Sequence, residues 1–241
     1  MGRDLTNKVA LVTGGSKGIG FGIAEALVDS GVNVTITSRS KSEVEAAAAG
    51  LNARGGGSVL ALTCDVRDFE AQQNVVTATV TTFGGLDALI ANAGVGMMAP
   101  VDLLSTDDWH TMIDTNLTGV FYSVKAAVED LKKTRGTIIT VSSLAGTNFF
   151  AGASGYNATK FGLTGFSQAI MLDLRRYGIR VSTIMPGSVA TSMGGRQSTE
   201  GNEWKLQPED MGEMVVYLLS TNSRNLPSKI EVRPSFPPGT S

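Results

Sequence analysis

The chain has 241 residues, of which 42% are hydrophobic and 17% are charged, and its formal net charge is −2 at pH 7. This apolar content can supply a hydrophobic core. The charges are nearly balanced, so the chain lacks the basic excess with which nucleic-acid-binding proteins neutralise phosphates, and this argues against that class of protein. A single cysteine, Cys64, excludes disulfides within the chain, and a single histidine, His110, leaves a zinc site dependent on carboxylates, so we expect no metal.

Short runs of β-branched residues alternate along the chain with longer segments of helical periodicity. The runs predict strands at Val9–Val12, Val32–Thr37, Val59–Thr63, Ala88–Ala91, Thr137–Val141, Val181–Ile184 and Ile230–Val232. The longer segments predict helices around Gly20–Ser30, Lys41–Ala53, Phe69–Thr82, Asp107–Lys133, Ser154–Tyr177 and Pro208–Ser220. Strict alternation of strand and helix implies a single α/β domain over residues 1–241, with a doubly wound parallel sheet of about seven strands and helices on both faces.

A glycine-rich turn joins the first predicted strand to the first predicted helix. Its sequence is Thr13-Gly14-Gly15-Ser16-Lys17-Gly18-Ile19-Gly20. Glycines let the chain turn sharply and let a diphosphate approach the backbone, and the helix N-terminus then offers unpaired N–H groups to the phosphates. The order of strand, glycines and helix therefore predicts a dinucleotide site, whose binding residues are Gly14, Ser16, Lys17, Gly18, Ile19 and Gly20.

The residues after the second predicted strand indicate which dinucleotide binds. A site that prefers NAD places a carboxylate there for the ribose 2′-hydroxyl, but this chain has Ser38 and Arg39, and the nearest downstream carboxylate is Glu43. Arg39 offers a planar fork for a 2′-phosphate, and Lys17 can add a second positive charge. The pattern favours NADP(H), and the alternative is a solvated arginine that opens the next helix.

Tyr156 and Lys160 lie four residues apart in a predicted helix, so their side chains share one face. A free tyrosine has a pKa of about 10 and is a poor base at neutral pH, but a fixed ammonium nearby lowers that pKa. The pair is therefore a candidate general acid/base for interconverting an alcohol and a carbonyl. An isolated pair at this spacing is common on helix surfaces. It therefore indicates an active site only when other residues of such a site are also present.

Further residues occur in a fixed order around this pair. They are the triplet Asn92-Ala93-Gly94 after the fourth predicted strand, Asn116 in a long predicted helix, Ser143 thirteen residues before Tyr156, and Pro186-Gly187 after the sixth predicted strand. With the glycine loop and Lys160, they make nearly the whole chain resemble the short-chain dehydrogenase/reductase family, in particular its 3-oxoacyl reductase and carbonyl reductase members. The resemblance implies a Rossmann-type fold.

The resemblance also implies a role for each matching position. Tyr156 would donate a proton to a reduced carbonyl, and Lys160 would bind the nicotinamide ribose hydroxyls and lower the pKa of Tyr156. Ser143, rather than the adjacent Ser142, would hydrogen-bond the substrate oxygen. Asn116 would hold a helix irregularity and a water that relays protons, although a mid-helix asparagine is more commonly on a solvated face. The remaining cofactor contacts would be Asp65 and Val66 beside the adenine, Asn92, Ala93 and Gly94 at the central strands, and Pro186, Gly187, Val189 and Thr191 on the nicotinamide side.

The leading hypothesis is an NADPH-dependent reductase that interconverts a carbonyl and a secondary alcohol. The alternatives are an NAD-dependent alcohol dehydrogenase of the same family and a non-catalytic NADP-binding regulator, although a regulator need not keep the four candidate catalytic residues together. The substrate is open among 3-oxoacyl thioesters, free ketones, aldehydes and sugars. Specificity is expected to reside in Leu144–Ser154, in Ser188–Leu206 and in the loop near Met97.

The C-terminal segment departs from the family pattern. Many members close with an Ile-Thr-Gly-like turn and a Val-Asp-Gly-Gly-like strand end, which residues 226–234 of this chain lack. The resemblance implies a homodimer or a homotetramer, and because this region often contributes to the subunit interface, the mode of assembly is open. The lack of disulfides and of an apolar leader favours a cytoplasmic location, with neither a membrane nor a nucleic acid as partner.

Overall fold

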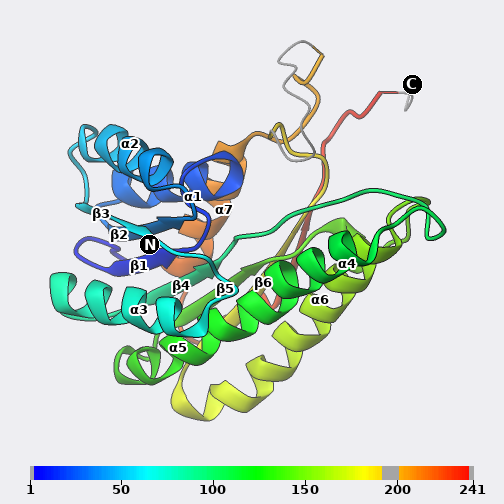
Figure 1. The fold of residues 1–241 in the computed structure, drawn as a ribbon. Helices are drawn as coiled ribbons and strands as arrows, with labels where there is room; N and C mark the ends of the chain where they lie inside the picture. The colour runs from blue at the N-terminus through cyan, green and yellow to red at the C-terminus, as the bar shows by residue number, and fades with distance from the viewer. Residues whose placement is uncertain (1–2, 192–200, 239–241) are drawn as a thin grey trace.

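The strands form one parallel sheet at the centre of the molecule (Figure 1). The computed structural model describes residues 3–191 and 201–238, and in these residues seven strands pair in the order β3-β2-β1-β4-β5-β6-β7. The strands are β1 (Val9–Val12), β2 (Asn33–Ser38), β3 (Val59–Thr63), β4 (Ala88–Ala91), β5 (Thr137–Val141), β6 (Arg180–Pro186) and β7 (Lys229–Val232). All seven predicted strands are confirmed. The strand order reverses between β1 and β4, which opens a crevice at the carboxyl ends of these strands.

Helices cover both faces of the sheet, as Figure 1 shows. One layer contains α1 (Gly18–Asp29), α2 (Lys41–Asn52) and α7 (Pro208–Ser220), and the other contains α3 (Phe69–Phe83), α5 (Gly119–Thr134) and α6 (Ser154–Leu174). Neighbouring strand residues point to opposite layers, so Val12 packs under α1 while Leu11 packs under α3. Because both faces are covered, the central strands are apolar throughout.

The prediction of one continuous helix over Asp107–Lys133 is wrong in one respect, because a π-helical turn interrupts it. The structure has α4 (Thr106–Ile113), then a π-helical turn at Asp114–Thr118, then α5. A π turn adds one residue to the helical repeat, and the apolar periodicity on either side survives this insertion. The predicted helix Ser154–Tyr177 is likewise α6 followed by a 3₁₀ turn at Arg175–Tyr177.

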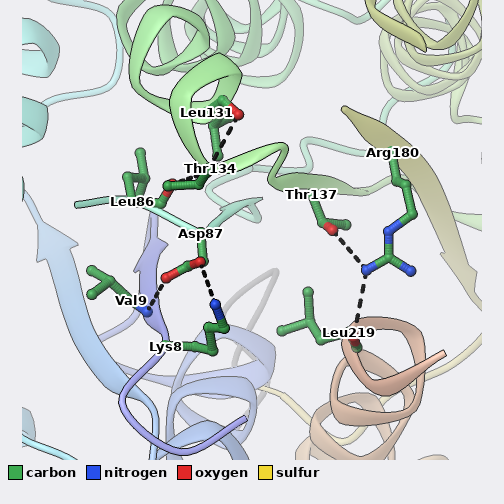
Figure 2. Close-up of polar contacts among 9 residues, drawn as sticks. All are labelled: Lys8, Val9, Leu86, Asp87, Leu131, Thr134, Thr137, Arg180 and Leu219. Carbon is green, nitrogen blue, oxygen red and sulfur yellow. Dashed lines mark hydrogen bonds and ion pairs between the residues drawn. The ribbon is translucent and has the colours of Figure 1, made fainter. Parts of the chain in front are cut away.

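Polar contacts fix the amino-terminal edge of the sheet, opposite the crevice (Figure 2). The guanidinium of Arg180 donates to Thr137 Oγ1 at 3.0 Å, to Thr221 Oγ1 at 2.9 Å and to the carbonyl of Leu219 at 3.4 Å. It thereby joins β5 and β6 to the C-terminal end of α7, where a cation also complements the helix dipole. Asp87 accepts from Lys8 Nζ and from the backbone N–H of Val9, both at 3.0 Å, and these two bonds hold the starts of β1 and β4 together.

Across residues 3–191 and 201–238, the structure contains no helix that is both long enough and apolar enough to cross a membrane.

Candidate functional site

The glycine loop between β1 and α1 is shaped for a ligand. Gly14 and Gly18 have φ angles of +67° and +56°, which side chains disfavour, and a Cβ on Gly20 would lie 2.2 Å from the carbonyl oxygen of Gly14. No side chain caps the N-terminus of α1 at Lys17, so the first N–H groups of the helix are left for a ligand. These residues fit the diphosphate of a dinucleotide. Ser16 is half-buried in the same turn, and Ile19 packs against the core.

Asn92 ties this loop to the central strands. Its Nδ2 donates to the carbonyl oxygens of Thr13 at 2.9 Å and Gly14 at 3.2 Å. In return, Thr13 Oγ1 accepts from the backbone N–H groups of Asn92 and Ala93, both at 3.1 Å. The ends of β1 and β4 are therefore held in register at the point where the strand order reverses. The role of Thr13 in this contact was not predicted from the sequence.

The π turn brings Asn116 to the loop that follows β4. Asn116 is completely buried, its Oδ1 accepts from the N–H of Val95 at 2.8 Å, and its Nδ2 donates to the carbonyl of Val95 at 2.8 Å and to Thr159 Oγ1 at 3.1 Å. The expected helix irregularity at Asn116 is thus present. A Cβ on Gly94 would lie 3.2 Å from Asn116 Oδ1 and 3.7 Å from Lys160 Nζ, so Gly94 passes directly over both groups.

Ser143 and Tyr156 meet at the carboxyl end of the sheet. Ser143 follows β5, Tyr156 lies in the first turn of α6, and the Ser143 hydroxyl is close enough to lower the pKa of Tyr156. The neighbouring Ser142 points elsewhere, since its hydroxyl is buried against the carbonyl of Lys160 at 3.3 Å and Thr164 Oγ1 at 3.1 Å. Of the two serines, Ser143 is therefore the one whose hydroxyl acts on Tyr156.

Burial dominates the electrostatics of this pair of titratable side chains. Lys160 is 4% exposed, its Nζ donates to the carbonyl of Val141 at 3.0 Å, and desolvation lowers its pKa to about 8. Desolvation likewise raises the pKa of Tyr156, and the hydrogen bond with Ser143 opposes this only in part. Burial therefore sets the direction of the pKa shift of Tyr156, and its lowering by Lys160 stays a prediction. The ammonium lies 5.7 Å from the centre of the tyrosine ring.

Asn157 is a positioning residue that the sequence analysis missed. Its buried side chain donates to the carbonyls of Ala145 at 2.7 Å and Asn148 at 2.6 Å, and accepts from the N–H of Phe150 at 3.3 Å. These bonds fix the loop that follows Ser143. Its position next to Tyr156 was the only signal available.

The charged residues predicted around the adenine end of the cofactor differ in whether they form ion pairs. Arg39 is exposed after β2 and, within residues 3–191 and 201–238, takes part in no ion pair. Lys17 Nζ lies 3.4 Å from the carboxylate of Glu43 on the surface, a pair that a ligand can displace at little cost. Asp65 holds Arg67 at 2.6 Å, which lowers the pKa of that carboxyl, and the charge of Arg39 lowers it further.

Val66, predicted to border the adenine, is buried. The residue is 6% exposed, and Gln72 Nε2 donates to its carbonyl oxygen at 2.8 Å. Because both the side chain and the carbonyl are engaged inside the protein, only the remaining backbone of Val66 can border an adenine.

The segment after β6 crosses from the sheet to the glycine loop. The N–H of Gly187, which follows Pro186, donates to the carbonyl of Val232 at 2.8 Å, and Val189 pairs with Leu206. A Cβ on Gly18 would lie 3.3 Å from Thr191 Cγ2, so Thr191 sits over the phosphate turn. Part of the predicted specificity segment Ser188–Leu206, residues 192–200, lies outside the described residues.

Comparison with known proteins decides the family. The model of the short chain dehydrogenase family matches residues 8–202. The chain belongs to this family. It is 35% identical over 230 residues to a trans-4-hydroxycyclohexanecarboxylate dehydrogenase of Sinomonas cyclohexanicum, covering 91% of this chain and 88% of the relative. It is 31% identical over 236 residues to the 3-oxoacyl-[acyl-carrier-protein] reductase FabG of Chlamydia muridarum, covering 94% and 95% of the two chains.

Solved structures of the short-chain dehydrogenases have the same architecture. An alcohol dehydrogenase from Thermococcus sibiricus, complexed with 5-hydroxy-NADP, superposes with a TM-score of 0.91 at 28% identity, covering 97% of this chain and 99% of that one. A metagenomic short-chain oxidoreductase in complex with NADP gives a TM-score of 0.84 at 30% identity, covering 98% and 100%. This protein is therefore an oxidoreductase of a family that acts on alcohol and carbonyl groups with a nicotinamide cofactor.

Proposed function

We propose that this short-chain dehydrogenase is an NADPH-dependent reductase of carbonyl compounds, with Tyr156 as the general acid/base. The observation that carries the proposal is the meeting of Ser143, Tyr156, Lys160 and Asn116 at one end of the sheet, beside a glycine loop that fits a diphosphate. A regulator that only bound the dinucleotide would have no use for Ser143 and Tyr156 placed together at this end of the sheet.

The proposed mechanism assigns one task to each of the four side chains. The glycine loop and Arg39 would hold a nicotinamide cofactor, which would supply the hydride for the carbonyl carbon of the substrate. Ser143 donates a hydrogen bond to the carbonyl oxygen as negative charge develops there. Tyr156 transfers its phenolic proton to that oxygen, which completes the alcohol and leaves a phenolate, and Lys160 stabilises this phenolate by its charge. Asn116 holds the loop carrying Gly94 against Lys160.

The raised pKa of Tyr156 fits the role of proton donor. The phenol is protonated at neutral pH, and a protonated phenol is the form that gives a proton to a reduced carbonyl.

Two observations support NADPH as the reductant. The chain places Arg39, free of ion pairs within the described residues, where an NAD site has a carboxylate, and Glu43 is paired with Lys17. Two similar solved structures hold 5-hydroxy-NADP and NADP. The small-molecule substrate, the homo-oligomeric assembly and the cytoplasmic location stay predictions.

The test is an NADPH-depletion screen with purified protein over 3-oxoacyl thioesters, ketones, aldehydes and sugars. We expect at least one class to be reduced, and Tyr156→Phe to lower kcat by ~10²-fold or more, the usual scale for the loss of an acid/base. The variant must have the melting behaviour of the wild type. Near-normal turnover by Tyr156→Phe, or no turnover of any class by protein that binds NADPH, would contradict the proposal.

A further inference from the structure

The chain that follows β7 starts close to the loop that follows Ser143. A Cβ on Gly187 would lie 3.1 Å from Pro234 Cδ and 3.2 Å from Leu144 Cδ1, so Pro234 and the residue that follows Ser143 both lie against Gly187. Thr147 Oγ1 also donates to Glu231 Oε1 at 3.2 Å, which links the loop after Ser143 to β7. The C-terminal tail, which we define as residues 234–236, therefore begins near the loop that carries the candidate catalytic serine.

From there the tail runs beside the segment that precedes α7 (Figure 1). Residues 234–236 on one side, and residues 203–206 with Asp210 on the other, enclose a hollow of about 270 Å³. A cavity of ~150 Å³ already accommodates benzene, so this hollow has room for a ring with its substituents.

An aromatic residue lines the hollow on each of these two sides. Phe236 belongs to the tail and is 85% exposed, and Trp204 belongs to the opposite side. Two of the charged groups around the hollow are occupied, since the Asp210 carboxylate accepts from the N–H of Gln207 at 2.7 Å and Lys205 Nζ lies 5.7 Å from the Trp204 ring. A ring placed between Phe236 and Trp204 would bury apolar area on both sides and would need no ionic partner.

We infer that Phe236 and Trp204 determine substrate specificity by binding an uncharged, apolar ring of the substrate, while its carbonyl reaches Ser143 and Tyr156. The inference rests on the proposed reductase function and names the substrate class as apolar, ring-bearing ketones or aldehydes. It assigns to the tail, where this chain departs from its family, the task of covering the part of the substrate that does not react.

The kinetic test uses three methyl ketones whose second substituent ends in a phenyl ring, in hydrogen or in a carboxylate. We expect wild-type protein to reduce 4-phenyl-2-butanone with a kcat/KM about tenfold or more above that for 2-butanone, because burial of one ring is worth more than the ~1.4 kcal/mol that a tenfold ratio requires. Phe236→Ala and Trp204→Ala should each lower this ratio by about tenfold. Tyr217→Ala, which removes an aromatic ring 53% exposed on α7, is the control and should leave the ratio unchanged. A ratio unaffected by both hollow variants, or a preference for the anionic 4-oxopentanoate over both neutral ketones, would overturn the inference.

A binding measurement separates this inference from the proposed function. The chain contains two tryptophans, so Trp109→Phe leaves Trp204 as the single fluorescent reporter. Titration of this variant and NADP⁺ with 4-phenyl-2-butanone should give a saturable change in fluorescence, and Phe236→Ala should raise the Kd about tenfold. If no carbonyl compound of any class is reduced, the reductase proposal fails, while this titration still tests whether the hollow binds a ring. Absence of a saturable change overturns the inference even where the enzyme reduces other carbonyls.

Discussion

At Lys160, burial sets the pH at which the side chain loses its charge. Its pKa is lowered from 10.5 to about 8, so the amine is charged below that pH and neutral above it. In the proposed mechanism the charge stabilises the phenolate left when Tyr156 gives up its proton. We therefore expect kcat/KM for carbonyl reduction to fall above about pH 8, which a pH profile at a fixed ionic strength measures.

The conservative variant Lys160→Arg identifies the titrating group. A guanidinium stays charged across the accessible pH range, so the fall near pH 8 should vanish even where the overall rate is lower. An unchanged fall in this variant would assign it to another group. Because the folded pKa lies below the unfolded value, unfolding takes up a proton between about pH 8 and 10.5. The Lys160 contribution to the free energy of unfolding should therefore rise with pH through that window.

Arg39 is expected to select the cofactor. Arg39→Asp removes a charge-assisted contact to the 2′-phosphate and adds a repulsion, and such contacts are worth ~1.5–3 kcal/mol. The ratio of kcat/KM for NADPH over NADH should fall about 10- to 100-fold. Lys41→Asp makes the same change of charge two residues away on an exposed side chain and should leave the ratio nearly unchanged. Equal ratios in wild type and Arg39→Asp would refute the assignment.

Residue spacing predicted which side chains meet but not how they are charged. The spacing selected Ser143, Tyr156 and Lys160, and the structure brings these three together. The spacing could not show that both Tyr156 and Lys160 are almost fully buried, and that this burial raises the pKa of Tyr156 and lowers that of Lys160. Asn157 was missed for a similar reason, since its partners are backbone carbonyls that only the folded loop brings near.

At the scale of elements, side-chain caps mark where α4 and α3 begin. Ser105 and Asp68 precede these helices, and their side chains accept from the N–H groups of Asp108 and Ala71, both at 3.0 Å. The π turn at Asp114–Thr118 was not readable from periodicity, because the two flanking helices each keep a regular apolar face. What holds the turn is Asn116, through contacts to a loop more than twenty residues earlier in the chain.

Arg180 should anchor α7 to the sheet without affecting catalysis. Arg180→Met removes the hydrogen bonds to Thr137, Leu219 and Thr221 shown in part in Figure 2, at the edge opposite the candidate active site. We expect a loss of ~2 kcal/mol in the free energy of unfolding, or about 4–8 °C in Tm, with kcat nearly unchanged. Arg175→Met, at an exposed arginine after α6, is the control. Equal melting temperatures for the two variants would show that Arg180 does not anchor α7 to the sheet.

For the whole molecule, the alternation of strands and helices was enough to predict the doubly wound sheet, because parallel strands need crossover helices and those crossovers are right-handed. The number and order of the strands agree with this expectation in the described residues. Assembly is different, since no strand or helix pattern specifies what covers the outer face of a helix.

The outer faces of α5 and α6 are expected to pair with a second copy of the chain. Phe121 on α5 is 46% exposed, and Phe161 and Leu172 on α6 are 37% and 53% exposed. Phe121 also meets Phe166 edge to face, which continues the apolar surface from one helix to the other. Monomeric proteins rarely leave such a continuous apolar surface in water, and a two-fold axis would bury it against itself. We expect a dimer or a tetramer of the 25.1 kDa chain by light scattering at micromolar concentration.

Substitutions on either side of the sheet test where the copies meet. Phe121→Glu places a charge at the centre of the expected interface and should dissociate the assembly, because an unpaired charge buried there would cost several kcal/mol. Ala46→Glu adds the same charge to an exposed position on α2, over the opposite face of the sheet, and should leave the assembly intact. Wild-type protein that scatters light as a monomer would refute the prediction. Dissociation by Ala46→Glu but not by Phe121→Glu would show that the interface lies on the layer of α1, α2 and α7 instead.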